Sequence, residues 1–205
     1  MGCGAGARRD VVHPRLTLAA IARCPLAPRG GRAKLVPTMA DADATAVRTA
    51  TEADYPAVAA AIQTWWTLPG LDTEAAARER AAMVPRLWLQ HFATTSAIAE
   101  RAGQLAGFLI GFLSQDRGDE GYIHFVGVAP DRRGEGLGRR LYEGFFERCR
   151  AAGRRRVRCI TSPANTISIA FHQAMGFELE GSGAAQVKPD YDGPGVARVA
   201  FVRSL

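Results

Sequence analysis

The spacing of hydrophobic and polar positions changes twice along residues 45–205. Apolar side chains first recur at helical intervals, with Val58, Ile62 and Trp65 on one side of an alanine-rich stretch. The interval between apolar residues then shortens to that typical of strands, and after Val128 segments with helical and strand patterns alternate. The predicted strands are 45–50, 96–100, 105–113, 122–128, 157–161, 177–180 and 196–202, and the main predicted helices are 51–66, 73–82, 137–152 and 165–175. This order predicts a single α/β (α+β) domain, in which about four helices flank a central mixed sheet of six to seven strands.

Length and composition place that domain at residues 45–205, after an extension of residues 1–44. The chain has 205 residues, 47% of them apolar, and no run of the roughly 18 apolar residues that a membrane span needs. The extension is rich in glycine, proline and arginine and has no sustained apolar period. We expect it to be disordered or non-native, with Met39 as the natural start, and a transit peptide is the alternative.

Charge and cysteine content exclude several classes of function. The net charge is +6, but seven basic and three acidic residues in 1–44 supply four of those charges, so the domain itself has no strongly basic face. The four cysteines have no metal-ligand spacing. We therefore expect a cytoplasmic protein with free thiols, no metal, and neither nucleic acid nor membrane as a partner.

A glycine-rich loop carries the clearest chemical signal. The predicted strand ending at Val128 is followed by Arg133-Gly134-Glu135-Gly136-Leu137-Gly138, and a helix begins there. Unpaired N–H groups at a helix start bind anions, and glycines let a phosphate approach them. No lysine follows as a Walker A loop requires, and Arg139 replaces the third glycine of a dinucleotide loop. A CoA pyrophosphate loop remains, with a purely structural turn as the alternative.

Two motifs then resemble one superfamily. Val126-Gly127-Val128-Ala129-Pro130 followed by Arg133-x-x-Gly136-x-Gly138 resembles the cofactor motif of the GNAT acetyltransferases. Asn165-x-x-Ser168-x-x-Phe171-His172-x-x-x-Gly176-Phe177 resembles their second motif. The motifs cover roughly residues 120–180, and the predicted elements extend the match to about 45–205. Residues 123–128, 161–163 and 190–195 resemble a bacterial subgroup to which we can assign no acceptor.

The resemblance implies acetyl-CoA as the acyl donor and gives each motif position a role. Two parallel strands, near Val128 and Thr161, are expected to splay apart around the cofactor. The cofactor-binding residues are expected to be Val126, Gly127 and Val128 beside the pantetheine arm, Gly134, Glu135, Gly136, Leu137, Gly138 and Arg139 with Arg133 at the pyrophosphate, and Asn165, Ser168 and Phe171 on the far side.

The expected catalytic residues depart from the superfamily pattern. His172 stands where a tyrosine often protonates the departing thiolate, so it is either that general acid or a helix residue that packs beside the cofactor. No carboxylate lies on the strand at Cys159, where several members carry a general base. His124 is the first alternative base, directly or through water, with a structural or substrate-contacting role as the other interpretation. Because it alternates with Val126 and Val128, we expect all three side chains on one face.

The acceptor site is the least defined. Trp65 and Trp66 end the first helix, so one is expected in the core and the other at the acceptor. Asp190 and Tyr191 are candidate substrate contacts, although an aspartate in Tyr-Asp-Gly-Pro-Gly is more often a turn former. These residues favour direct acetyl transfer to a primary amine in a ternary complex, with a small molecule as acceptor rather than a peptide. An acyl-cysteine route through Cys159 is disfavoured, since buried strand cysteines are inert.

Two further interpretations concern the protein as a whole, namely an alternative function and an oligomeric state. The missing glutamate and tyrosine also suit a non-catalytic acyl-CoA-binding or sensing module. Superfamily members are often dimers, so a homodimer is a natural partner arrangement.

Overall fold

The structure is a computed structural model that describes residues 44–66 and 73–205. The chain divides between residues 36 and 37 into two units, and all described residues belong to the second. The predicted extension therefore lies, except for Ala44, outside the described residues, and so does the predicted helix break at Pro69-Gly70.

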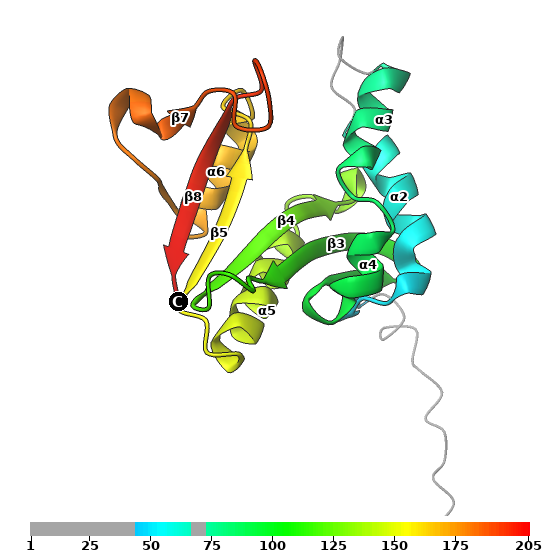
Figure 1. Cartoon of the computed structure of the whole chain (residues 1–205). Coiled ribbons are helices and arrows are strands. Elements are labelled where there is room, and N and C mark those ends of the chain that lie inside the picture. The colour runs from blue at the N-terminus through cyan, green and yellow to red at the C-terminus, as the bar shows by residue number, and fades with distance from the viewer. Residues whose placement is uncertain (1–43, 67–72) are drawn as a thin grey trace, which may run out of the picture. The chain divides into compact units, whose positions relative to one another are not determined.

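Within the described residues, eight strands form one mixed sheet, and the described helices pack on it (Figure 1). Seven strands follow the order β1-β2-β3-β4-β5-β8-β6, and β7 pairs with β8. Their bounds are β1 Ala46–Thr49, β2 Ala97–Arg101, β3 Gln104–Leu113, β4 Glu120–Val128, β5 Arg156–Thr161, β6 Glu178–Leu179, β7 Val187–Lys188 and β8 Arg198–Ser204. The predicted fold class is confirmed, while β7 was missed because its two residues carry no period.

Helices lie on both faces of the sheet. The described α-helices are α2 Tyr55–Thr64, α3 Glu74–Ala82, α4 Leu87–His91, α5 Leu137–Ala151 and α6 Thr166–Ala174. Local side chains fix two of the helix starts: Thr73 accepts from the Ala76 N–H at the start of α3, and Asn165 accepts from the Ser168 N–H at the start of α6. Among the described helices none is long and apolar enough to cross a membrane.

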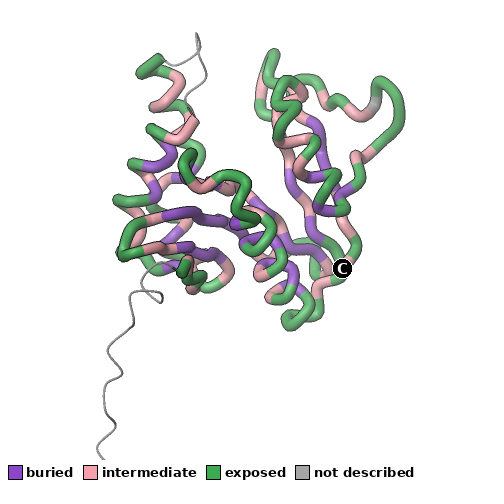
Figure 2. Tube along the Cα trace, turned by 180° about the vertical axis from the view of Figure 1, so that it is seen from behind, coloured by how far each residue is buried: buried purple, intermediate pink, exposed green. Residues whose placement is uncertain are grey.

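Two hydrophobic clusters hold these helices to the sheet. The first joins α5 and α6 to one face of β3, β4, β5 and β8, and the second joins α2 and α4 to the other face of β2, β3 and β4. Buried positions accordingly follow the strands and one side of α5 (Figure 2). The apolar stripe of Leu137, Leu141, Phe145 and Cys149 predicted from the sequence is buried against the sheet, as expected.

The parallel strands β4 and β5 are paired over only part of their length. The register joins Glu120 to Arg156, Gly121 to Val157 and Tyr122 to Arg158, and no pairing follows beyond them. Figure 1 shows the two strands diverging from that shared end. The remainder of β4 therefore exposes a backbone edge toward the opening, as the predicted splay requires.

A β-bulge in β4 overturns one expectation about side-chain direction. Opposite β3, Ile110 pairs with Phe125 and Gly111 pairs with Ile123, so His124 is an extra residue. Beyond the bulge, Val126 and Val128 pack toward the α5 cluster. His124 instead stacks on Trp88 of α4, with ring centroids 4.0 Å apart. The prediction that His124 shares a face with the two valines is wrong, because the inserted residue breaks the alternation.

Candidate functional site

The predicted phosphate loop lies at the start of α5. Gly134 and Gly136 have φ angles of +85° and +75°, and a Cβ atom at either position would meet nothing within 4 Å. These glycines are thus required by backbone conformation, and the surface above them is open. The first hydrogen bond into the helix runs from the Arg140 N–H to the Gly136 carbonyl, so the preceding N–H groups point out of the helix end. This geometry suits an anionic group.

Gly138 serves a different purpose in the same motif. A Cβ atom there would lie 3.3 Å from the ring of Phe171 and 3.8 Å from a methyl group of Val128. The glycine therefore lets α5 approach α6 and the end of β4 closely. Asn165 and Ser168 likewise have a local role, because the Asn165 side chain caps α6 through the Ser168 N–H at 3.1 Å. The second motif thus positions α6 beside the loop.

The charged side chains of the loop are held by neighbours. Arg133 donates to the carbonyl oxygen of Trp65, the residue that ends α2, at 2.8 Å. Glu135 lies within 3.4 Å of Arg101, and Arg139 lies 3.8 Å from Glu143. The loop is in this way tied to α2 and to the β2–β3 hairpin, both of which lie outside the cofactor motif.

His172 lies in the core between α5 and α6 and is 5% exposed. Its Nδ1 donates to the Ser168 carbonyl oxygen at 2.7 Å, so Nε2 accepts from the hydroxyl of Tyr142 at 2.9 Å. The ring also stacks on Phe201. Burial lowers the pKa of His172, and its hydrogen bond to Ser168 opposes this only in part. Of the two interpretations of His172, this placement favours packing, since both ring nitrogens are already engaged.

His124 differs from His172 because only one of its ring nitrogens has a protein partner among the described residues. Its Nε2 lies 2.6 Å from the carbonyl oxygen of Met83, which can only accept, so the proton is on Nε2 and Nδ1 carries a lone pair. Among the described residues no protein group bonds to that Nδ1. Burial lowers the pKa of His124, while the Met83 contact and the charge of Asp192 work against that lowering. His124 is therefore a neutral imidazole at neutral pH with a lone pair available.

The two tryptophans both pack on the α2 side of the sheet. Trp65 and Trp66 lie with ring centroids 5.8 and 6.3 Å from that of Phe108, and both are partly buried. A Cβ atom on Gly127 would lie 2.7 Å from the Trp66 ring, so that glycine makes room for it. Trp66 thus reaches β4 at Gly127, on the face opposite the side chains of Val126 and Val128.

A pocket of about 510 Å³ opens on the face of the sheet opposite α5. Its walls come from the β3–β4 turn, the paired ends of β4 and β5, and the segment from β6 to β8. Its aromatic lining residues are Phe112, Tyr122, Tyr191 and Phe201. Tyr122 stacks on Phe112, and Phe112 contacts Trp88, the ring that stacks on His124. The pocket and the imidazole of His124 therefore lie on the same face of the sheet.

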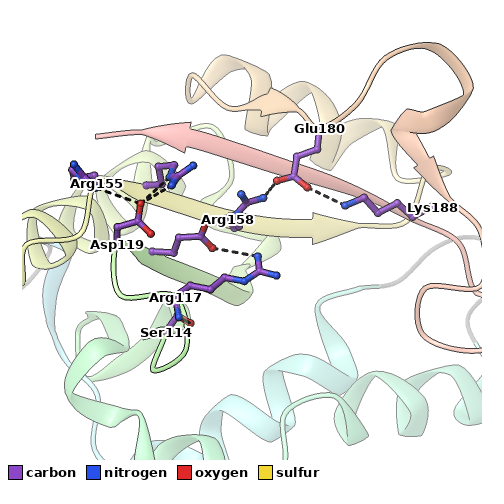
Figure 3. Close-up of polar contacts among 9 residues, drawn as sticks. Ser114, Arg117, Asp119, Arg155, Arg158, Glu180 and Lys188 are labelled. Carbon is purple, nitrogen blue, oxygen red and sulfur yellow. Dashed lines mark hydrogen bonds and ion pairs between the residues drawn. The ribbon is translucent and has the colours of Figure 1, made fainter.

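A chain of alternating charges crosses this pocket (Figure 3). Arg117 lies 3.4 Å from Glu120, and Glu120 lies 2.8 Å from Arg158. Arg158 pairs in turn with Glu180, which lies 2.9 Å from Lys188. Sequence reasoning missed all five residues. Charged side chains at alternate positions of a strand, as at Arg156 and Arg158 of β5, were the available signal.

The two predicted substrate contacts near residue 190 have different surroundings: Asp190 stabilises a turn, and Tyr191 lines the pocket. Asp190 has a φ of +53°, and its carboxylate accepts from the Gly195 N–H at 2.5 Å, the arrangement of a turn former. Tyr191 lines the pocket and is 47% exposed. Asp192 pairs with Arg198 at 2.7 Å.

The described cysteines offer no nucleophile. Cys149 and Cys159 are free and buried. Burial raises the pKa of the Cys149 thiol to about 11 and that of the Cys159 thiol further, so neither thiolate forms near neutral pH. No group of three or more metal-ligating side chains occurs in residues 44–66 and 73–205.

A splayed parallel strand pair beside a glycine loop and a helix start defines an acyltransferase-type fold, with a pocket on the face of the sheet opposite α5. The profile of the acetyltransferase (GNAT) family matches residues 58–177, more than half of the chain, and the chain belongs to that family. It is also similar in fold to N-acetylglutamate synthase from Neisseria gonorrhoeae in complex with coenzyme A and N-acetyl-glutamate. That match has a TM-score of 0.58 and 22% identity, over 79% of this chain and 35% of the other.

Several curated relatives are acetyltransferases named for amino-acid substrates, and one, from Thermobispora bispora, is a mycothiol acetyltransferase. L-2,4-diaminobutyric acid acetyltransferase from Nocardia farcinica is 34% identical over 43% of this chain and 46% of its own length. L-methionine sulfoximine/L-methionine sulfone acetyltransferase from Pseudomonas paraeruginosa is 36% identical over 39% of this chain and 50% of its own. The chain thus spans about half the length of the curated relatives it matches.

Proposed function

We propose that this protein is an acetyl-CoA-dependent N-acetyltransferase that moves the acetyl group directly to a primary amine of a small molecule. The observation that carries the proposal is the opening beyond Tyr122 and Arg158, where β4 leaves β5 next to the open start of α5. Acetyl-CoA, when bound, supplies an activated thioester. The Gly134–Gly138 loop suits its pyrophosphate, and the free edge of β4 suits its amide-rich arm.

The residues on the acceptor face supply the proton transfer. A neutral amine forms the new C–N bond as the thioester C–S bond breaks, and Nδ1 of His124 takes the amine proton directly or through one water. Backbone N–H groups on the free edge of β4 stabilise the charge on the carbonyl oxygen. The leaving thiolate takes its proton from water, because the hydrogen bonds of His172 to Ser168 and Tyr142 engage both its nitrogens.

The test is release of free CoA from acetyl-CoA in the presence of a panel of amines, including 2,4-diaminobutyrate and methionine sulfone. Initial velocities should give intersecting lines when both substrates are varied, as direct transfer requires, whereas a covalent enzyme intermediate gives parallel lines. Tight acetyl-CoA binding without turnover on any amine would support the sensing module instead.

A further inference from the structure

The pocket opposite α5 has an unusual balance of charge. Three acidic and three basic side chains line it, namely Asp116, Glu120, Glu180, Arg117, Arg158 and Lys188. A purely cationic ligand would face three cations there, and a purely anionic ligand three carboxylates. A ligand with one charge of each sign meets a partner for both. Its volume of about 510 Å³ lies within the range of small-molecule sites.

Stability alone does not account for this arrangement. The side chains of Glu120 and Arg158 are only 8% and 22% exposed, so their charges are largely removed from water. Such ion pairs add little net stability, since desolvation offsets the attraction. Charged groups fixed in place within a pocket are instead ready to bind a polar ligand.

Lys188 is the cation best placed to bind that ligand. It ends the charge chain, Glu180 is its one carboxylate partner among residues 44–66 and 73–205, and its side chain is 37% exposed, so donor capacity remains. The register pairs Val187 with Val199, and Val199 with Thr161. Lys188 therefore lies level with the end of β5 that has parted from β4, with β8 between them. Arg117, the other terminal cation, lies in the β3–β4 turn near the paired end.

We propose that this pocket is the acceptor subsite and that the acceptor is a free amino acid, whose carboxylate is held by Lys188 while its reacting amine points to the opening between β4 and β5. The proposal rests on the N-acetyltransferase function above and specifies its substrate class. Glu180, next to Lys188, keeps the ammonium of Lys188 oriented before the substrate arrives. Tyr191 and Tyr122 supply apolar contact for the substrate side chain.

The experiment compares each amino acid with its carboxamide, which keeps the amine and loses the negative charge. We expect the full chain to prefer 2,4-diaminobutyrate and methionine sulfone over their carboxamides by about 30-fold in kcat/KM, as a charge-assisted contact predicts. Lys188→Met should remove most of this preference and leave kcat/KM for the carboxamide and KM for acetyl-CoA within about twofold of the parent. Arg155→Met is the matched control: Arg155 is 81% exposed, pairs with Asp119 and lies outside the pocket.

The possible results distinguish failure of the proposed amino-acid subsite from failure of the proposed N-acetyltransferase function. Equal turnover of acid and carboxamide by the parent protein would overturn the amino-acid assignment and leave the N-acetyltransferase function standing. Turnover of no amine would remove that function, and calorimetric titration with methionine sulfone then tests the subsite separately. Binding that Lys188→Met abolishes and Arg155→Met retains would sustain the subsite, and absence of binding to the parent protein would refute it.

Discussion

The Nε2 atom of His124 and the carbonyl oxygen of Met83 lie 2.6 Å apart, and this contact fixes the tautomer of the imidazole. A carbonyl cannot donate, so the proton is on Nε2 and the lone pair is on Nδ1. The bulge that makes His124 an extra residue in β4 turns it toward α4 and the acceptor face. One backbone irregularity thus sets both the direction and the protonation of the candidate base.

Replacing His124 by glutamine should lower kcat/KM by about 100-fold, the lower end of general-base contributions. The pKa of His124 is below its ordinary value of 6.5, so the loss of activity that comes from protonation of His124 should begin only below that value. The plot of kcat/KM against pH for His124→Gln should lack this decrease at acidic pH. His91→Gln, at an exposed position of α4, is the control and should change neither rate nor profile. An unchanged decrease at acidic pH in His124→Gln would assign the titration to another group.

Gly136→Ala tests the phosphate loop. Its φ of +75° should cost about 1–2 kcal/mol of stability for a residue with a Cβ atom. The methyl group also projects over the helix start, so KM for acetyl-CoA should rise about tenfold. Gly153→Ala is matched to it, with a φ of +72° and open space around the Cβ position, at the far end of α5. The control should lose similar stability and keep KM for acetyl-CoA. Equal KM values for the two variants would argue against the loop as donor site.

His172 and Tyr142 form a buried pair whose removal should be non-additive. Tyr142 keeps an unpartnered hydroxyl in His172→Phe, which should cost about 1–3 kcal/mol of unfolding free energy. Adding Tyr142→Phe removes both polar groups, so the double variant should be closer to the parent. Urea unfolding of all four proteins gives the coupling. A fall of kcat by about 100-fold in His172→Phe with stability intact would restore its role as general acid.

The pH dependence of stability follows from the same residue. Burial holds the folded-state pKa of His172 below 6.5, so the unfolded chain binds the proton more strongly. This contribution to stability is complete above pH 6.5 and is lost as pH falls from there through the folded-state pKa. Urea unfolding from pH 8 to pH 5 should show a smaller decline in His172→Phe than in the parent. Equal declines would place the titrating group elsewhere.

Cys159→Ala should retain acetyl transfer within about threefold, because burial keeps this thiol protonated and unreactive. Mass spectrometry of the parent protein after incubation with acetyl-CoA alone should show no acetylated Cys159. Detection of that adduct, together with loss of turnover in the variant, would establish the acyl-enzyme route.

The sequence predicted those parts of the site that depend on neighbouring residues. The glycine loop and the starts of α5 and α6 are local arrangements, and the residue spacing that produces them can be recognised in a single sequence. The direction of His124 was not, because it depends on how β4 registers against β3. The charge chain from Arg117 to Lys188 was also missed. Its members come from strands and turns that only the folded sheet brings together.

The bulge at His124 shifts the side-chain alternation of β4 by one residue, which places His124 on the other face from Val126 and Val128. Ile123, Val126 and Val128 face the α5 cluster, while Tyr122 and His124 face the α4 side. Mutations on the α4 side can alter which amine is accepted without disturbing the residues expected to hold the donor. A single inserted residue in this way moves the candidate base from the face of the expected donor residues to the face of the proposed acceptor pocket.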